Sequence, residues 1–554
     1  MSAITAERPH RNGVGTPAGR RAALDSEPKP PPAAKDGADR LAARRWWIVV
    51  AAMIGAVLEV LDTSITNVAV PQMMGNLGAT LSEIGWVSTG YIISNVIVLP
   101  MTGWLADRFG RRNYFAASIA VFTLASLMCG LAHTLPELII WRIVQGLGGG
   151  GLLATGQVIM LGAFPKEMQG MATGIFGMGV MVGPSLGPVL GGYLTDNLSW
   201  PWIFFINLPF GIAAMFLTLM FVEDSRTDAQ KRERPGTDFL GIGLLAAGMG
   251  SLQTVLERGQ EEDWFQSGMI ATLAAVAAVS LVSFVLWELH VPHPIVNLRV
   301  LKNRSLAAGT AFGVVLGIGL YATLFLLPVY LQNSQGYTAY QTGMMLFPSA
   351  IAGLFSFMIA GALSQKLDPR KMLAFGAFLM MTGTYGLSHL TSQSGPADIF
   401  VPMLIRGASM GFLFIPLTVA SLAGMKPHEM GVGSAMINLA RQLGGSIGIA
   451  ALSTTLTRRV VFHQQSVGDH LNAGNLAVND WITGVQANLI AHGVSPAAAH
   501  GAAIGQLARV AAKQAMILSF DDCFLMISVA FLCAMPLVLI FRKGEGAVDM
   551  GAVH

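Results

Sequence analysis

Fourteen stretches of about 20 mainly apolar residues follow one another between residues 46 and 541 of this 554-residue chain. A helix needs about 20 such residues to cross the hydrocarbon core of a bilayer. The chain is 53% hydrophobic and only 12% charged, whereas soluble domains carry about 25% charged residues and would aggregate with so apolar a surface. The sequence therefore predicts an all-α polytopic membrane protein. The predicted spans are 46–68, 84–104, 114–132, 137–163, 170–195, 202–222, 238–257, 270–290, 306–330, 341–364, 372–390, 399–424, 432–456 and 519–541.

The positions of lysine and arginine predict which side of the membrane each loop occupies. With the N-terminus in the cytoplasm, 26 of the 34 basic residues fall in cytoplasmic segments, five in outer segments and three within spans. Cytoplasmic loops of membrane proteins carry an excess of Lys and Arg. We therefore expect a multi-pass membrane protein with both termini in the cytoplasm. The net charge of +3 gives no indication of a nucleic-acid partner.

The segments outside the spans differ in kind. Residues 1–45, rich in Arg, Ala, Pro and Gly, are predicted to be a disordered cytoplasmic tail, because they cannot bury enough apolar surface to fold. Residues 542–554 are a second cytoplasmic tail. The chain does not open with the pattern of a cleaved signal peptide, so we expect the first span to remain in the membrane. The outer loop 457–518 is either a small, partly helical element, since apolar residues recur at helical spacing, or a solvated linker.

A weak internal repeat organises the spans. Gly103 and Gly361 begin similar loops after the second and tenth spans, 258 residues apart, and Arg142 and Arg406 lie 264 residues apart in the fourth and twelfth spans. Duplicated halves around a central site are typical of secondary transporters. We predict two six-helix halves, residues 46–222 and 306–541, with two inserted helices within residues 223–305.

Four local patterns stand at defined places in this arrangement. The loop after the second span reads Gly-x-x-x-Asp-Arg-x-Gly-Arg-Arg, the fourth span contains Arg-x-x-Gln-Gly, and the fifth carries a ladder of glycines and prolines. The first span contains the run Leu-Asp-Thr-Ser-Ile-Thr-Asn-Val-Ala-Val-Pro from residue 61. The residues of the loop are Gly103, Asp107, Arg108, Gly110, Arg111 and Arg112, and those of the ladder are Gly179, Gly183, Pro184, Gly187, Pro188, Gly191 and Gly192.

These four patterns, in this order, resemble the motifs of the major facilitator superfamily and of its fourteen-span drug:proton antiporters. Further runs, from Trp202 to Pro209 and from Glu257 to Gly259, are similar to those of multidrug exporters of Gram-negative bacteria. The resemblance covers residues 46–541. It implies export driven by the proton gradient, with a periplasmic adaptor protein and an outer-membrane channel as partners, and it gives Asn67 and Gln145 as further site candidates.

The acidic residues of the first span have a physical role that can be argued separately. Asp62 lies about 9 Å from the outer end of its span, and Arg142 about 8 Å from the outer end of the fourth. An unpaired charge at this depth costs roughly 3 kcal/mol or more, so a pairing of the two is expected. Movement relative to Arg142 could then load and release a proton on Asp62, and the alternative is a static ion pair. Glu59 lies on the same helical face and is a further candidate for proton coupling, with selection of cations as the alternative role.

The remaining candidates each have a plainer alternative. The glycine ladder lets another helix backbone approach closely, which is also what ordinary close packing requires. The basic loop is predicted to be a latch between helices, or it follows the rule for cytoplasmic charge alone. Arg406 and Arg441 are further charges within spans, functional or structural with equal weight. The 30 methionines suit a pliable apolar pocket, although most must pack helices or face lipid.

The sequence therefore predicts a proton-coupled exporter of hydrophobic drugs or toxic small molecules. The alternatives are a dedicated exporter of one metabolite, lipid or siderophore and, in a different class, a membrane sensor or enzyme, for which no catalytic cluster is present. Cys129, Cys523 and Cys533 form no metal-binding pattern. There is no phosphate-binding Gly-x-x-x-x-Gly-Lys motif, so we expect no cofactor, no metal and no ATP site.

Overall fold

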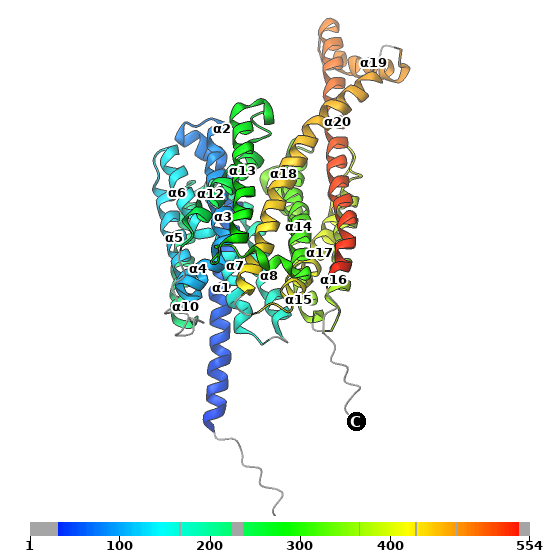
Figure 1. Ribbon diagram of the computed structural model, residues 1–554. Helices are drawn as coiled ribbons and strands as arrows, with labels where there is room; N and C mark the ends of the chain where they lie inside the picture. The colour runs from blue at the N-terminus through cyan, green and yellow to red at the C-terminus, as the bar shows by residue number, and fades with distance from the viewer. Residues whose placement is uncertain are drawn as a thin grey trace, which may run out of the picture. The chain divides into compact units, whose positions relative to one another are not determined.

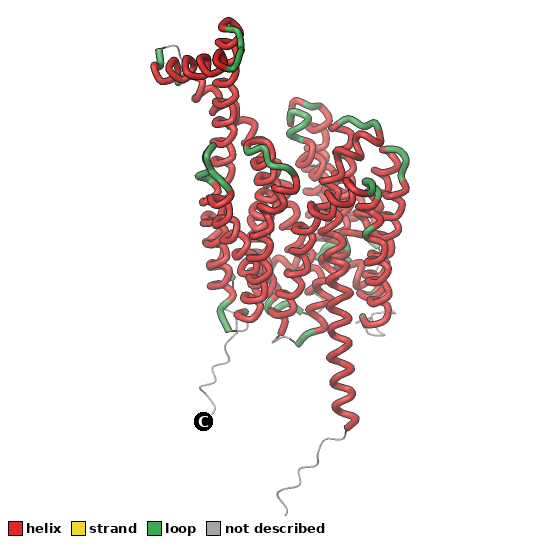
Figure 2. The backbone as a smooth tube through the Cα atoms, turned by 180° about the vertical axis from the view of Figure 1, so that it is seen from behind, coloured by secondary structure: helices red, strands yellow, loops and turns green. Residues whose placement is uncertain are grey.

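The computed structural model describes residues 32–165, 168–223, 237–364, 366–426, 429–471 and 474–541. Within these ranges every regular element is a helix (Figures 1 and 2). The chain divides into two compact units, residues 1–46 and residues 47–554. The all-α fold predicted from the apolar stretches is thus confirmed.

The tail predicted over residues 1–45 lies only partly within the described residues. Helix α1 begins at Pro32, so residues 32–45 are helical rather than disordered. This stretch is rich in alanine, the residue with the highest helix propensity. Residues 1–31 and 542–554, which include the predicted C-terminal tail, lie outside the described residues.

The helices of the first half interrupt the predicted spans at glycine and proline. The second span is divided where Pro100 stands in a 3₁₀ turn, since proline lacks the backbone N–H of a regular helix. The fourth span is divided at Gly150 and Gly151. The helices are α1 (Pro32–Leu77), α2 (Leu81–Ile84), α3 (Trp86–Val98), η1 (Leu99–Met101), α4 (Thr102–Phe109), α5 (Arg111–Leu131), α6 (Leu135–Gly149), α7 (Leu152–Ala163), α8 (Gln169–Asn197), α9 (Trp202–Phe205) and α10 (Asn207–Phe221).

The inserted pair and the second half follow. The inserted helices α12 and α13 pack against each other, and α12 also contacts α3 of the first half and α18 of the second. The helices are α12 (Phe239–Arg258), η3 (Trp264–Gln266), α13 (Gly268–His290), η4 (Leu298–Lys302), α14 (Arg304–Val329), the π-helical turn η5 (Tyr330–Ser334), α15 (Ala339–Leu363), α16 (Pro369–Leu387), α17 (Pro396–Leu422), α18 (Met430–Asp469), α19 (Leu476–Ala491), α20 (Pro496–Ala534) and η6 (Met535–Ile540).

The number of spans stays a prediction. Each of the fourteen predicted ranges falls on helix in the structure. Eleven helices among the described residues are long and apolar enough to cross a membrane. Those over 170–195, 372–390 and 432–456, namely α8, α16 and α18, are not among them.

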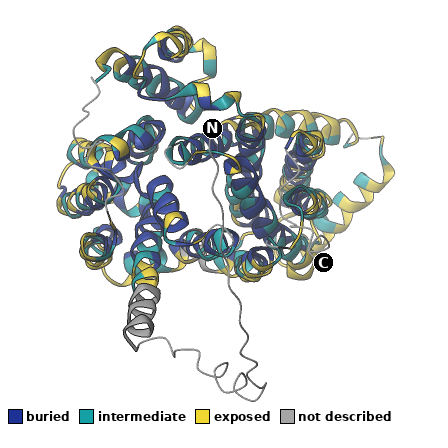
Figure 3. Cartoon of the chain, turned by 60° about the horizontal axis from the view of Figure 1, so that its bottom comes forward, coloured by how far each residue is buried: buried dark blue, intermediate teal, exposed yellow. Residues whose placement is uncertain are grey.

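Packing divides the helix surfaces into two kinds. Buried residues lie on the faces turned toward neighbouring helices, and exposed ones on the outward faces (Figure 3). On α13 the exposed residues include Val279, Val282 and Leu286, an apolar face that suits lipid. The two halves meet where α8 packs against α15 and α17, and where α18 packs against α4 and α7.

The outer loop 457–518 is mostly helical. Helix α18 has 40 residues and α20 has 39, so each is roughly 60 Å long and exceeds the hydrocarbon core of a bilayer, about 30 Å. Their ends, with α19, stand beyond the other helices (Figure 1). Asp522 ties the two long helices together through Arg459, 3.0 Å away, and His463, 2.7 Å away. This supports the helical element over the solvated linker.

Candidate functional site

The side chain of Asp62 is fully buried at the centre of a polar cluster. Its Oδ2 atom lies 2.5 Å from Nη1 of Arg142. Its Oδ1 atom accepts hydrogen bonds from the amide groups of Gln145, at 2.8 Å, and Asn207, at 3.1 Å. The carboxylate therefore has a donor on each oxygen, and the predicted pairing of Asp62 with Arg142 is present.

The side chain of Arg142 has further hydrogen bonds and ring contacts besides its ion pair with Asp62. Its Nε donates to the backbone carbonyl of Val87 at 3.1 Å, and Nη1 donates to Oε1 of Gln145 at 2.9 Å. The guanidinium also lies over the rings of Tyr91, at 4.4 Å, and Phe204, at 5.6 Å. Carbonyls and aromatic faces both attract a cation. These contacts hold the guanidinium of Arg142 independently of Asp62. We therefore expect Arg142 to stay in place if the carboxylate of Asp62 moves away or is replaced.

Asn207 is the functional candidate that sequence reasoning missed. It starts α10, is fully buried, and its Nδ2 also donates to Ser126 at 3.0 Å. A polar side chain inside an apolar stretch is the signal that could have found it, because such groups are rare in membrane spans and need partners. Its partner lies 145 residues away in the chain, a distance at which sequence gives no pairing.

Glu59 belongs to a second network. It is one turn from Asp62 on α1, but its Oε1 accepts from Nδ2 of Asn95 at 3.1 Å and its Oε2 accepts from the backbone N–H of Leu153 at 2.8 Å. Leu153 is in the first turn of α7, where the free N–H groups and the helix dipole favour a negative charge. The structure therefore gives Glu59 and Asp62 separate partners.

The glycine ladder of α8 packs directly on the helix that carries Asp62. A Cβ atom at Gly183 would lie 2.9 Å from the backbone nitrogen of Leu61, and one at Gly191 would lie 3.0 Å from the side chain of Ile65. Gly187 faces Ser64 of the same helix, and Gly179 faces Met53. Gly192 has open space on its Cβ side. The side chains of Pro184 and Pro188 lie outside the described residues, although α8 runs through both positions.

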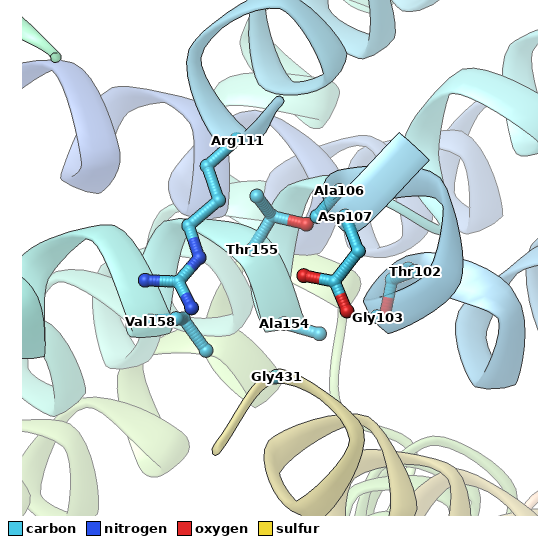
Figure 4. A pocket seen from close by; sticks show the side chains of 9 residues that line it. All are labelled: Thr102, Gly103, Ala106, Asp107, Arg111, Ala154, Thr155, Val158 and Gly431. Atoms are coloured by element: carbon cyan, nitrogen blue, oxygen red, sulfur yellow. The ribbon is translucent and has the colours of Figure 1, made fainter. Parts of the chain in front are cut away.

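The loop predicted as a latch meets the other half of the protein. A Cβ atom at Gly103 would lie 2.8 Å from the side chain of Val432 in α18. Figure 4 shows Asp107 and Arg111 lining one small pocket with Gly431. Gly110 links α4 to α5 with φ of +87°, a conformation that favours glycine.

The two other basic residues of the loop have different surroundings. The guanidinium of Arg108 lies 5.5 Å from the ring of Trp104. The Nε of Arg112 is buried without a hydrogen-bond partner among the described residues. The contact with α18 fits a latch between the halves, which stays a hypothesis.

The last three candidates lie apart from Asp62. Asn67 is exposed, and in the described part of the chain its Oδ1 accepts a single hydrogen bond, from Oγ of Ser88 at 3.4 Å. Arg441 bonds with Asn438 and lies 4.9 Å from the ring of Phe414. Asn438 in turn donates to Gln157 of α7, so this cluster bridges the two halves. Arg406 lies in α17 and lines a second pocket together with residues of α8, α14 and α15.

Comparison with known proteins identifies the family. The profile of the Major Facilitator Superfamily matches residues 52–449. The chain belongs to this superfamily. It is therefore a multi-pass membrane protein with the fold of a transporter, and the family predicted from the motifs is confirmed.

Several relatives are similar over nearly their whole length. The chain is 34% identical over 506 residues to the fatty acid resistance protein FarB of Neisseria gonorrhoeae, covering 90% of this chain and 97% of FarB. It is 34% identical over 503 residues to the multidrug export protein EmrB of Escherichia coli strain K12, covering 90% of this chain and 96% of EmrB. Among solved structures, the proton:xylose symporter XylE superposes with a TM-score of 0.57 at 14% identity, covering 91% and 97% of the two chains. That likeness concerns the fold alone.

Proposed function

We propose that this superfamily member is a proton-coupled exporter of hydrophobic drugs or toxic small molecules across the bacterial inner membrane, and not an enzyme. The observation that carries the proposal is the buried carboxylate of Asp62, which is paired with Arg142 and sits on a helix packed against the glycine ladder of α8. Ionisable groups within spans mark proton or ion pathways. The relatives named as multidrug exporters support the direction of transport. No cofactor is required, because the proton gradient supplies the energy.

The mechanism follows from the contacts of Asp62. In general a cation beside a buried acid favours the charged form of that acid, and burial without a cation favours the neutral, protonated form. The glycines of α8 that face α1 have no side chains, so α1 could shift along α8 without a clash of side chains at these positions. A shift that moves Asp62 away from Arg142 would let it take a proton, and the return would release the proton. Coupling this shift to the rocking of the two halves gives exchange of protons for substrate.

The orientation gives this exchange its direction. With both termini in the cytoplasm, as the Lys and Arg distribution predicts, α18, α19 and α20 extend into the periplasm. Protons then enter from the periplasmic side and substrate leaves toward it. The extended helices give a periplasmic adaptor protein a surface to bind, and the adaptor would connect the exporter to an outer-membrane channel.

A dedicated exporter of one class of compound is the second candidate. The relative FarB is named for resistance to fatty acids rather than to many drugs. The same proton mechanism would serve either function. The two differ only in the range of compounds that drive proton movement.

The test uses inverted membrane vesicles that contain the protein. The vesicles are energised, hydrophobic drugs are added one at a time, and collapse of the pH gradient is recorded for wild type, Asp62→Asn and the matched control Asp196→Asn, an exposed acid at the end of α8. We expect drug-dependent collapse in wild type and in the control, and none in Asp62→Asn at equal protein level. Collapse that survives in Asp62→Asn would move the proton site elsewhere. No collapse with any drug in wild type would refute the drug exporter and favour a dedicated exporter or a mechanism without protons.

A further inference from the structure

The inserted helix α12 lies where the two halves of the protein meet. It packs against α3 of the first half and against α18 of the second. The contacts of α18 with α4 and α7 lie near its first residues, at Val432 and Ser434. Its contacts with α12 lie further along, at Ser446. The inserted helix therefore joins the halves at the opposite end of α18 from the loop predicted as a latch, the end that the Lys and Arg distribution places outside.

Two polar contacts join α12 and the turn after it to α18. Gln253, which is fully buried, donates from Nε2 to Oγ of Ser446 at 2.7 Å and to Oε1 of Glu257 at 2.9 Å. Further along α18, Oγ1 of Thr454 accepts a hydrogen bond from Nε1 of Trp264 at 3.1 Å. Ser446 and Thr454 are eight residues apart, so they lie on one face of α18. Both contacts join neutral groups, and such bonds contribute only modestly to stability.

A charged contact joins the same end of α12 to the first half. Arg258, the last residue of α12, is only 3% exposed, and its Nη2 donates to Oγ of Ser82 at 2.6 Å. The guanidinium also lies 5.3 Å from the centre of the Trp86 ring at the start of α3, and Nη1 pairs with Glu261 at 2.8 Å. Hydrogen bonds from a charged donor are stronger than those between neutral groups, and the aromatic ring adds to the attraction. The first half therefore holds this end of α12 more firmly than α18 does.

The turn that carries Trp264 has a strained backbone. Asp263 and Trp264 both have φ of +52°, and no other residue except glycine has a positive φ in the described part of the chain. A bulky residue rarely adopts this conformation, which persists only where neighbouring contacts hold it. Nε1 of Trp264 also donates to Gln260 at 3.1 Å, and a Cβ atom at Gly259 would lie 2.7 Å from the Trp264 ring. Gly259 thus leaves room for the ring, and the strained turn directs the indole N–H to Thr454.

We propose that residues 253–264 form a gate between the halves, which stays with the first half and releases Ser446 and Thr454 when the outer ends of α3 and α18 separate. In transport by rocking of two halves, contacts at the two ends of the boundary between them are not all kept in both states. Val432 and Thr454 are 22 residues apart, about 33 Å along α18, so this one helix carries a contact at each end. The inference goes beyond the proposed export function, because such a gate serves transport in either direction.

The experiment measures how fast a cysteine within the gate reacts with a water-soluble maleimide, in the full chain reconstituted in nanodiscs. The cysteine is Ala450→Cys in a Cys533→Ser background, since Cys533 is exposed and the two other cysteines are buried. Ala450 is buried one turn from both Ser446 and Thr454. A buried thiol reacts only when its surroundings open, so the rate follows the population of the open gate. Both faces of a nanodisc are accessible, so the result does not depend on orientation.

Paired substitutions on α18 distinguish the gate from general packing. Ser446→Ala together with Thr454→Val removes both acceptors, and the reaction should become roughly twofold to tenfold faster for each lost hydrogen bond. The matched control is Ser453→Ala together with Thr455→Val, because these hydroxyls donate to carbonyls of α18 itself. The control should react as the parent protein does. Ser82→Ala should also leave the rate unchanged, because the contact of α12 with the first half is kept in both states.

Two results would overturn the inference. An equal rate in the Ser446→Ala, Thr454→Val protein and in its control would mean that these contacts do not hold the halves together. A faster reaction in Ser82→Ala, without a change in the double variant, would mean that α12 separates from the first half instead. If the double variant does not fold, Trp264→Phe gives the same test, since it keeps a ring and removes the indole N–H. The readout needs neither drug nor pH gradient, so failure of the vesicle assay in wild type would refute drug export and leave the gate standing.

Discussion

The two residues of the Asp62–Arg142 ion pair are predicted to contribute unequally to the free energy of unfolding. Replacing Arg142 with Met leaves the carboxylate of Asp62 buried with only the amides of Gln145 and Asn207 as donors. Breaking a buried pair by removing one partner costs about 3–5 kcal/mol. Asp62→Asn should cost less, because the arginine keeps the carbonyl of Val87, the amide of Gln145 and two aromatic rings. We expect about 1.5–3 kcal/mol for that variant, the range for one lost hydrogen bond to a charged group.

The combined variant distinguishes pairing from independent effects. Asp62→Asn together with Arg142→Met leaves no uncompensated charge, so its free energy of unfolding should be no lower than that of Arg142→Met alone. The assay is reversible unfolding by sodium dodecyl sulfate in mixed micelles, followed by circular dichroism, for wild type, both single variants and the double variant. If the two single losses add up in the double variant, the groups do not stabilise each other, and the argument for an ion pair as the proton site fails.

Three further predictions follow from other contacts. Gly183→Ala should abolish drug-dependent proton movement and lower the free energy of unfolding by about 1–3 kcal/mol, because the added methyl group would lie 2.9 Å from the backbone of α1. The control Gly192→Ala should behave as wild type, since its Cβ side is open. Asp522→Asn should increase hydrogen exchange in segment 457–518. The free energy of unfolding should change by less than about 1 kcal/mol, since both partners of Asp522 are partly exposed. Unchanged exchange would contradict a stabilising contact between α18 and α20 at Asp522. Glu59→Gln should keep proton movement with neutral drugs and weaken the response to cationic ones, and an equal loss for both would place Glu59 in the proton pathway itself.

Much of the fold could be predicted because its signals are local. The length and apolar content of the fourteen stretches predict a helix in each, and the structure has helix in all of them, since the bilayer requires backbone groups to bond within the segment. The tail is an exception, because low apolar content indicated disorder while its alanines favour helix over residues 32–45. The outer loop left two alternatives open because helical spacing of apolar residues does not reveal what they pack against.

The candidate site was only partly predictable. Equal depth in the membrane was enough to pair Asp62 with Arg142, since both distances follow from counting residues along two helices. Glu59 shares a helical face with Asp62, as counting along the chain predicts, but its partners on α3 and α7 could not be predicted because they lie far away in the sequence. Asn207 was missed because nothing in its own neighbourhood indicates a partner 145 residues away.

The sequence by itself determined that this chain spans a membrane, belongs to a transporter family and carries an acid and a base at matching depth. Apolar length, charge distribution and short motifs are written along one chain, so they can be counted. Only the tertiary structure decided that two amides share the carboxylate of Asp62, that the ladder of α8 rests on α1, and that Arg406 faces a pocket without an acid. These facts depend on how helices far apart in sequence turn and approach one another, because side-chain packing, unlike helix formation in a bilayer, is set by partners that the local sequence does not contain.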